Sequence, residues 1–364
     1  MKKTILALTA TALSLSLAFL SGCTESKAAD SKALVIEKQG WFSAGGKIAY
    51  AEGEMTDVYK SAGQSIHYDH AVAFYQKPAN AKKTAFVYLH GNTQTGRCWS
   101  TTPDGREGWS EYFLRRGYSS YLIDQPRRGN AARNAMDVTV PAMPVEQMYF
   151  DQFRLGRWPD FYEGVSFPQD EESVNQFWRQ MTADVGAQDM SAITDGVAAV
   201  LEKSGEAVLF THSAGGVYGW FSAMKSGNVK AIVAVEPGAF PFPQGEAPEA
   251  IQSGYLTLRG ISAKPTEIPK EEFDKLTRFP IIVYFGDFIS DGHSDHPSTD
   301  YWYATREMAR HFARIVNEHG GDCTVVSLPE IGLKGNTHFT MSDLNNKEVA
   351  EHIEKWLEDK GLNR

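Results

Sequence analysis

The chain is 364 residues long, 42% of its residues are hydrophobic, and its formal net charge is −9 at pH 7. This length suits one large domain with an insertion and a sizeable core, although two domains would also fit. The acidic balance argues against a nucleic-acid partner.

The N-terminal segment has the pattern of an export signal. Two lysines precede an apolar run over residues 5–20, which is too short to serve as a durable membrane span. The run ends in Leu-Ser-Gly directly before Cys23, as in the bacterial lipoprotein signal, where the cysteine is lipidated and becomes the new N-terminus. We therefore predict a signal peptide over 1–22 and a lipidated Cys23 that opens a tether over 23–34. This interpretation places the protein at the cell envelope, with the lipid as its sole membrane contact; an ordinary secretory signal is the alternative.

From residue 84 onward, short runs rich in β-branched and aromatic residues alternate with segments of helical period. Such alternation predicts an α/β fold for residues 35–364, with a mostly parallel central sheet, helices on both faces and a β lead-in over 35–78. The expected strands are 84–89, 118–123, 206–211, 229–235, 281–285 and 323–328. The expected helices are 108–116, 189–203, 214–226, 300–319 and 346–359.

The segment over about 129–185 interrupts this alternation and carries many aromatic residues. Because it separates two expected strands, it is an insertion within the domain. Such insertions in α/β enzymes lie over the carboxyl ends of the strands, where ligands bind. We therefore predict a lid or cap; a packing excursion without substrate contact is the alternative.

The strongest chemical signal is the sequence Thr-His-Ser-Ala-Gly-Gly around Ser213, between an expected strand and an expected helix. A serine hydroxyl is a weak nucleophile until a base removes its proton, and a tight strand-to-helix turn exposes it at the edge of the sheet. The helix N-terminus adds positive charge near a developing oxyanion. Thr211 stands where the GxSxG pattern has its first glycine. Ser213 is therefore predicted to be a catalytic nucleophile.

A second signal is the run from His90 to Thr93, which follows the expected strand 84–89. A tetrahedral intermediate places negative charge on the former carbonyl oxygen, and two backbone N–H groups aimed at that oxygen stabilise it. We expect the N–H groups of Ala214 and Asn92 to form this oxyanion hole, with Thr93 as the next choice after Asn92.

The general base should be a histidine beyond the last strand, because the chain order in this arrangement is serine, acid, histidine. His338 fits this position. Glu236 is the preferred acid, since a charged residue directly after the apolar strand 229–235 points to the edge where ligands bind. Asp287 and Asp291, which follow the next strand, are the alternatives.

Together these motifs resemble the α/β-hydrolase superfamily and, within it, the bacterial esterase-713-like group. The resemblance covers nearly all of the mature chain and rests on the segments 101–109, 124–125, 211–213, 235–237 and 335–338. It implies ester hydrolysis and a glutamate acid after the sixth strand, which would be Glu236. Members typically carry adjacent cysteines where Asn92 and Thr93 stand here.

The sequence therefore predicts a serine carboxylesterase that forms an acyl-enzyme on a small-molecule ester, with no cofactor. Phe240 and Phe339, close to the acid and the base in the chain, are candidates for a substrate pocket or for plain packing. A lactonase, an amidase or a polyester depolymerase could use the same triad. A non-catalytic, surface-anchored binding protein could retain the fold. The sequence does not determine the oligomeric state.

The remaining clusters are expected to be structural. Cys98 and Cys323 should stay unpaired, because the fold separates them by the length of a strand, roughly 20 Å. Three arginines, Arg127, Arg128 and Arg133, are expected on a solvated loop, with contact to an acidic substrate as the alternative. No metal is expected, because helical i, i+4 histidine pairs are missing from both clusters of ligand-type residues: His293, Asp295 and His296, and His67, Asp69 and His70.

Overall fold

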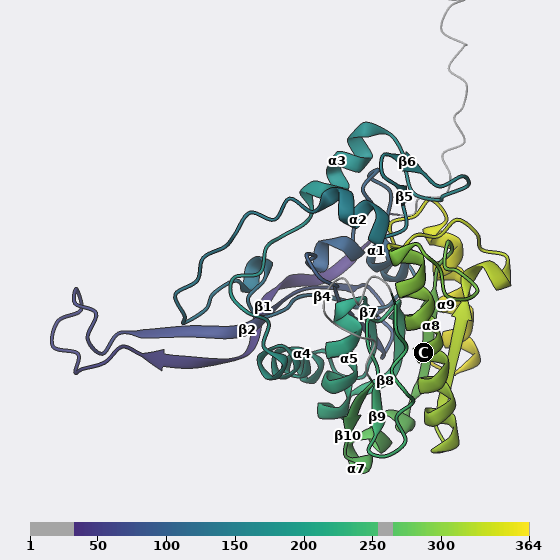
Figure 1. The fold of residues 1–364 in the computed structure, drawn as a ribbon. Helices are drawn as coiled ribbons and strands as arrows, with labels where there is room; N and C mark the ends of the chain where they lie inside the picture. Colours follow the sequence, from purple (N-terminus) through teal and green to yellow (C-terminus); the bar gives the residue numbers. More distant parts are fainter. Residues whose placement is uncertain (1–32, 254–264, 364) are drawn as a thin grey trace, which may run out of the picture. The chain divides into compact units, whose positions relative to one another are not determined.

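An eight-stranded sheet lies at the centre of the fold (Figure 1). The computed structural model describes residues 33–253 and 265–363. Contacts divide the chain into an N-terminal unit, Met1–Val35, and one compact unit, Ile36–Arg364. The predicted signal peptide and Cys23 lie outside the described residues.

The strands follow the spatial order β1-β2-β4-β3-β7-β8-β11-β12. β1 pairs antiparallel with β2, and β2 pairs antiparallel with β4. The six strands from β4 to β12 are parallel to one another. Their bounds are β1 Ile36–Tyr50, β2 Ser65–Pro78, β3 Ala85–Leu89, β4 Ser120–Asp124, β7 Ala207–His212, β8 Val229–Val235, β11 Pro280–Phe285 and β12 Asp322–Ser327.

Helices cover both faces of the sheet, because the strand side chains alternate between two buried hydrophobic cores. One core packs against α4 (Met190–Ser204), α5 (Ala214–Lys225) and α8 (Pro297–Glu318). The other packs against α1 (Trp109–Leu114) and α9 (Asn346–Asp359). The predicted fold class, a mostly parallel sheet with helices on both faces, is confirmed.

Helix boundaries differ from the expected ones where a cap decides them. The helix expected at residue 300 begins at Pro297, because proline suits the first helical turn and the His296 side chain accepts the Thr299 N–H at 3.5 Å. α9 has the predicted bounds and is followed by Gly361 at φ 69°. A left-handed glycine at this position is the usual end of a helix.

The segment 129–185 forms its own small elements between β4 and α4 (Figure 1). Its aromatic side chains, among them Tyr149, Phe153 and Phe177, join the core on the α1 and α9 face. The elements are η2 Gly129–Ala131, α2 Glu146–Gln152, β5 Gly156–Arg157, β6 Asp160–Phe161 and α3 Glu171–Arg179. Smaller elements elsewhere are η1 Gly96–Trp99, β9 Pro241–Pro243, β10 Thr266–Ile268, α7 Lys270–Phe273, η3 Asp274–Arg278 and η4 Leu328–Ile331.

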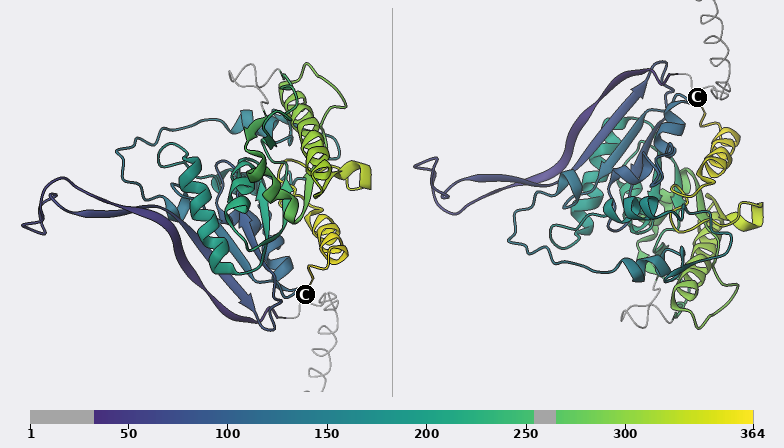
Figure 2. Two further views of the ribbon diagram at one scale, coloured as in Figure 1. Left: turned by 90° about the horizontal axis from the view of Figure 1, so that it is seen from below. Right: turned by 90° about the horizontal axis from the view of Figure 1, so that it is seen from above.

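The β1–β2 hairpin continues past the sheet as an arm (Figure 2). α4 packs against β1 at the base of the arm, where a Cβ on Gly45 would lie 3.1 Å from the Gly196 Cα. From Gly45 to Tyr68, no residue of the arm is buried. The arm therefore adds no residue to either of the two hydrophobic cores.

Cys98 and Cys323 are both free and buried, as predicted. Cys98 lies beyond the carboxyl end of β3, and Cys323 lies at the start of β12. Among residues 33–253 and 265–363, no helix combines the length and the apolar character that crossing a membrane requires.

Candidate active site

Ser213 occupies the sharp turn between β7 and α5. Its backbone has φ 53° and ψ −123°, a conformation that is costly for a residue with a Cβ and that is typical of an exposed nucleophile. Neighbouring backbone holds the turn in place: the Ser213 N–H donates to the Val235 carbonyl at 3.0 Å. The Ser213 carbonyl accepts the N–H groups of Gly216 at 2.9 Å and Gly238 at 3.1 Å.

Glycines allow the close packing around this turn. A Cβ on Gly91 would lie 2.8 Å from the Ser213 Cβ, and a Cβ on Gly215 would lie 2.3 Å from the His90 carbonyl oxygen. A Cβ on Gly219 would meet the Thr211 Cγ2 at 2.5 Å. Gly219 on α5 therefore provides the room that lets Thr211 stand where the usual motif has a glycine.

A cavity of about 320 Å³ opens beside Ser213. Its wall includes the predicted residues Asn92, Ala214, His338 and Phe339. The insertion and the segment before α4 contribute much of the remaining wall, through Met148, Tyr149, Gln152, Phe153 and Gln188. Val217, Gly238, Tyr301 and Trp302 complete a lining that is partly aromatic and partly amide.

His338 is buried and held by contacts on several sides. Its ring Nδ1 lies 2.5 Å from the Glu236 Oε2, and its backbone N–H donates to the Phe153 carbonyl at 2.9 Å. The His338 carbonyl lies 3.0 Å from the His212 Nε2, which therefore carries the proton. The Phe153 ring stacks on the His338 ring at a centroid distance of 5.4 Å. These contacts leave Nε2 of His338 as the nitrogen available for chemistry.

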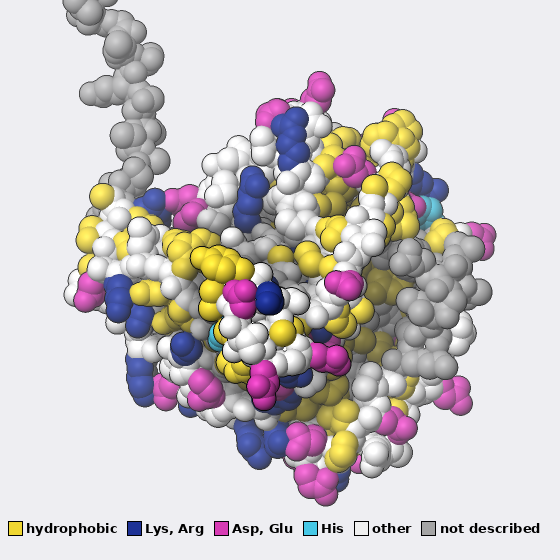
Figure 3. Space-filling model, turned by 90° about the vertical axis from the view of Figure 1, so that its left-hand side faces the viewer, with side chains coloured by type: hydrophobic (Ala, Val, Ile, Leu, Met, Phe, Trp, Pro, Cys, Tyr) yellow, Lys and Arg dark blue, Asp and Glu magenta, His cyan; other side chains and the backbone are white. Residues whose placement is uncertain are grey.

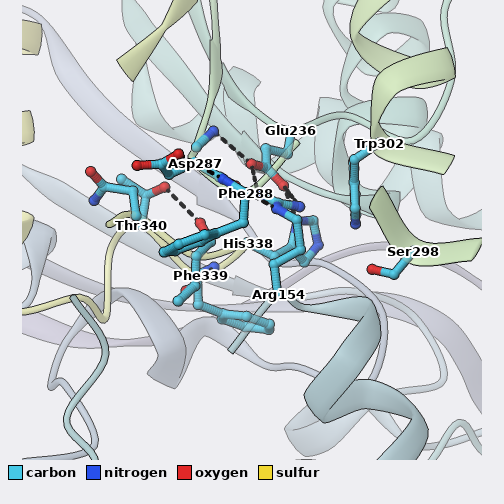
Figure 4. Close-up of polar contacts among 12 residues, drawn as sticks. Arg154, Glu236, Asp287, Phe288, Ser298, Trp302, His338, Phe339 and Thr340 are labelled. Carbon is cyan, nitrogen blue, oxygen red and sulfur yellow. Dashed lines mark hydrogen bonds and ion pairs between the residues drawn. The ribbon is translucent and has the colours of Figure 1, made fainter. Parts of the chain in front are cut away.

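The Glu236 carboxylate is fully buried and receives several donors (Figure 4). The Gly286 N–H donates to Oε1 at 2.7 Å, and the Arg154 Nη1 donates to Oε2 at 3.0 Å. The Arg154 Nη2 also donates to Oε1, which makes the pair bidentate. Burial alone would raise the pKa of Glu236, but the Arg154 guanidinium and the His338 ring outweigh it and lower the pKa to about 2.

His338 is neutral around neutral pH. Burial lowers the pKa of the His338 ring below its ordinary 6.5, although the Glu236 carboxylate acts in the opposite direction. A neutral ring whose Nδ1–H is fixed on a carboxylate can accept a proton at Nε2.

Arg154 is a site residue that the sequence reasoning missed. It comes from the insertion, has φ 58°, and is completely buried. Its Nε donates to the Asp287 carbonyl at 2.8 Å, and its guanidinium lies 5.1 Å from the Trp302 ring centroid. The one available signal was indirect: a buried glutamate at the end of an apolar strand requires a cation.

Asp287 and Asp291, the alternative acids, do not contact His338. Asp287 accepts the N–H groups of Phe288 and Gly335, each at 2.8 Å, and so fixes the loop that precedes His338. Asp291 is exposed. Glu236 is therefore the carboxylate that the fold brings to the histidine.

Two sequence interpretations need correction. Phe240 does not line the cavity: it is buried in the core against Trp220 and Phe312, because the chain turns away from the site into β9.

Arg127 and Arg128 are not on a solvated loop. Arg127 pairs with Asp69 at 2.7 Å. Arg128 is buried and pairs with Asp184, while also donating to the Gly91 carbonyl at 3.0 Å. Arg133 is exposed.

Three residues of the two possible metal clusters have other partners. His293 contacts Asp300 at 2.9 Å, and His296 contacts Asp151 at 3.0 Å. Asp69 is occupied by Arg127. No group of three or more ligand-type side chains arranged for a metal occurs within the described ranges.

The fold agrees with the comparisons to known proteins. Residues 86–351 match the model of the alpha/beta hydrolase family, and the chain belongs to that family. A fungal relative (strain ATCC 74256) described as the probable secreted lipase phiG is 28% identical over 346 residues, which cover 85% of this chain and 91% of the relative. A solved structure described as a novel bacterial esterase is 28% identical, with a TM-score of 0.72, covering 91% of this chain and 98% of that one.

Proposed function

We propose that this chain is a serine hydrolase of carboxylic esters from the esterase-713-like group, with Ser213, His338 and Glu236 as its triad. The observation that carries the proposal is the 2.5 Å contact between His338 Nδ1 and Glu236, beside a cavity that Ser213 also lines. The two relatives, one described as a lipase and one as an esterase, support ester substrates.

In this mechanism the Ser213 Oγ attacks the ester carbonyl while His338 Nε2 takes the hydroxyl proton. The same ring then protonates the leaving alcohol, and an acyl group remains on Ser213. Water, deprotonated by His338, releases the acid and restores the serine. Glu236 holds the ring in the required tautomer and stabilises its charged form.

Ser213 and His338 line the same cavity. Among the hydrogen bonds of the described residues, none joins these two side chains. Such bonds are often long in enzymes before substrate binds and tighten in the Michaelis complex. The backbone N–H groups of Asn92 and Ala214, at the turns after β3 and β7, are the proposed oxyanion donors.

The size of the cavity favours small esters. A volume of about 320 Å³ lies at the lower end of the range for small-molecule sites. The aromatic rings of Tyr149, Phe153 and Trp302 offer apolar contact to an acyl or alcohol group. An activity panel of aliphatic, aromatic and polymeric esters, with lactones and amides as contrasts, defines the substrate class.

The decisive test is Ser213→Ala, assayed on a short p-nitrophenyl ester. We expect turnover to fall by about a millionfold, as it does when the catalytic serine of a serine protease is removed. A fluorophosphonate probe should label the unmodified protein and fail to label this variant. Ser191→Ala, at an exposed serine on α4, is the control and should keep full activity. Near-normal turnover by Ser213→Ala would contradict the mechanism.

We also propose that the protein is exported and held at the cell envelope by lipid on Cys23. The fungal relative is described as secreted, which supports export. Cys23→Ser should move the protein from the membrane fraction to the soluble fraction, measured by fractionation and immunoblotting. An unchanged membrane fraction would exclude the anchor.

A further inference from the structure

Arg128 is a buried cation next to the candidate active site. On the face of the molecule in Figure 3, lysine and arginine side chains lie at the surface, as charged side chains usually do. The Arg128 side chain, in contrast, is 0% exposed. Its Nε donates to the Asp184 Oδ1 at 2.7 Å, and its Nη2 donates to the same oxygen. A cation this deep needs further partners, and those of Arg128 lie in the loop after β3.

The Gly91 carbonyl in that loop accepts hydrogen bonds from two side chains. The Arg128 Nη1 donates to it at 3.0 Å, and the His90 Nδ1 lies 2.8 Å from it. Because the His90 Nε2 accepts the Gln125 N–H at 3.3 Å, the ring proton is on Nδ1 and points at the carbonyl. Burial and the Arg128 charge lower the pKa of His90 to about 4, so the ring stays neutral and keeps this tautomer. The Gln94 N–H is a longer third contact at 3.4 Å. These donors fix the direction of the carbonyl.

The Gly91 carbonyl and the Asn92 N–H belong to the same peptide unit. This unit is trans, so its C=O and its N–H point in opposite directions within one plane. Donors that hold the carbonyl therefore aim the N–H away from themselves. Asn92 lines the cavity beside Ser213, and no group among the described residues accepts its N–H. A cation on the carbonyl also polarises the peptide, which strengthens the N–H as a donor.

The Asn92 side chain is held by the same network. Its Oδ1 accepts the Arg128 Nη2 at 3.4 Å and the Gln188 Nε2 at 3.2 Å. The Gln188 Nε2 also donates at 3.0 Å to Asp184, the carboxylate that pairs with Arg128. One guanidinium therefore contacts the carbonyl before Asn92 and the side chain of Asn92. Two attachments on either side of a single N–H restrict the rotation of its peptide plane.

We propose that Arg128 is a positioning residue of the oxyanion hole, which aims and strengthens the Asn92 N–H through the Gly91 carbonyl. This inference rests on the proposed function, because it takes Ser213 as the nucleophile and the Asn92 N–H as an oxyanion donor. A neutral ester carbonyl gains little from an aligned donor, whereas the oxyanion of the tetrahedral intermediate gains much. Arg128 should therefore control kcat and leave KM unchanged.

Two substitutions of Arg128 in the full-length protein test this role. Arg128→Met removes the guanidinium and keeps an unbranched side chain. Its kcat on a p-nitrophenyl ester should fall by about tenfold to a hundredfold, less than the hundredfold to thousandfold that direct removal of an oxyanion donor costs. Arg128→Lys keeps a charge that reaches one acceptor at a time, so it should recover part of the lost kcat.

A trifluoromethyl ketone inhibitor distinguishes positioning from folding. The Ser213 Oγ adds to the ketone carbon, His338 takes the hydroxyl proton, and the former carbonyl oxygen becomes an oxyanion in the proposed hole. In Arg128→Met, the Ki of this ketone should rise by the factor by which kcat/KM falls. The Ki of the corresponding secondary alcohol, which forms no adduct, should not change. A variant that is only partly folded would lose active sites but keep the Ki of those that remain.

Control variants separate the role of Arg128 from the loss of a buried ion pair. The double variant Arg128→Met with Asp184→Asn removes both charges, so it should regain any stability that Arg128→Met loses and retain the raised Ki. Arg133→Met changes an exposed arginine of the same segment and should leave every constant unchanged.

The inference is overturned if Arg128→Met keeps the ketone Ki of the parent protein, or if its KM rises while kcat is unchanged. A dead Ser213→Ala beside a fully active Arg128→Met would reject the role of Arg128 alone. An active Ser213→Ala would overturn the proposed function itself.

Discussion

Two buried carboxylates of the site region, Glu236 and Asp343, behave in opposite ways. Glu236, after β8, is paired with Arg154 and has a pKa of about 2. Asp343 lies in the loop after His338, and among the described residues no cation pairs with its carboxyl group, although Arg106 donates to its backbone carbonyl at 3.1 Å. Burial raises the pKa of this carboxyl to about 7. Asp343 accepts the Thr337 N–H and hydroxyl, each at 2.8 Å, and the Asn336 amide at 3.2 Å. Burial alone does not decide the charge of a carboxyl group; the partner that the fold supplies does. One acid is therefore suited to orient a base, and the other to brace a loop.

Among changes to the two carboxylates and the cation, removing the charge of Glu236 should have the largest effect on turnover. Glu236→Gln takes away the acceptor that fixes the His338 tautomer, and we expect kcat to fall by about ten-thousandfold, as for the equivalent change in serine proteases. Asp287→Asn is the matched control, because it changes a carboxylate in the adjoining loop that does not contact His338. Steady-state kinetics on a p-nitrophenyl ester compares the two. An active Glu236→Gln beside an inactive Asp287→Asn would reverse the assignment of the acid.

Because Glu236→Gln leaves Arg154 buried without an anion, this variant can also lose stability, by about 3–5 kcal/mol. Circular dichroism and thermal unfolding at the assay temperature show whether the protein is folded when its kinetics are measured. The double variant Glu236→Gln with Arg154→Met removes both charges. It should recover stability without recovering activity.

Removing the Arg154 guanidinium should reduce activity less than Glu236→Gln does, and the loss of activity should depend on pH. Activity requires Glu236 charged and His338 neutral. Arg154 lowers the pKa of both groups, so Arg154→Met raises both. The acid limb of kcat/KM should therefore move to higher pH, with a loss of about a hundredfold at neutral pH from misplacement of the ring. Arg154→Lys should restore part of the original pH profile. A uniform loss at every pH would indicate a purely structural role.

Asp343→Asn should affect stability more than catalysis. Because burial raises the folded-state pKa of Asp343 from 3.8 to about 7, its contribution to stability is complete below pH 3.8 and is lost as pH rises through about 7. The asparagine variant lacks this pH-dependent loss of stability. As pH rises across that window, its free energy of unfolding should therefore increase relative to that of the parent protein, by a few kcal/mol at most. Glu236 has the opposite sign, since its stabilisation is lost as pH falls from 4.5 towards 2. Urea unfolding at a series of pH values measures both slopes, and parallel curves for parent and variant would refute the buried-acid account.

The parallel sheet could be predicted because local patterns and burial agree there. The strand 229–235 is buried on both faces, and its apolar run gave its bounds. Ser213, His338 and Glu236, the residues of the proposed triad, could be singled out because each comes after a strand of the sheet. Arg154 could not be found in this way, since its partner lies 82 positions away in the chain and no local pattern marks a buried arginine. The prediction that Phe240 lines the pocket was wrong because proximity to Glu236 in the sequence does not determine the direction in which the chain leaves β8.

The origin of Arg154 constrains how this protein can be redesigned. Exchanging the segment over 129–185 is an obvious way to graft a different specificity onto the sheet, because that segment supplies part of the cavity wall. The same exchange would also discard the guanidinium that keeps Glu236 ionised. A chimera that omits an arginine at this point should fold around a protonated acid and remain inactive at mildly acidic pH, however well the new segment fits its substrate.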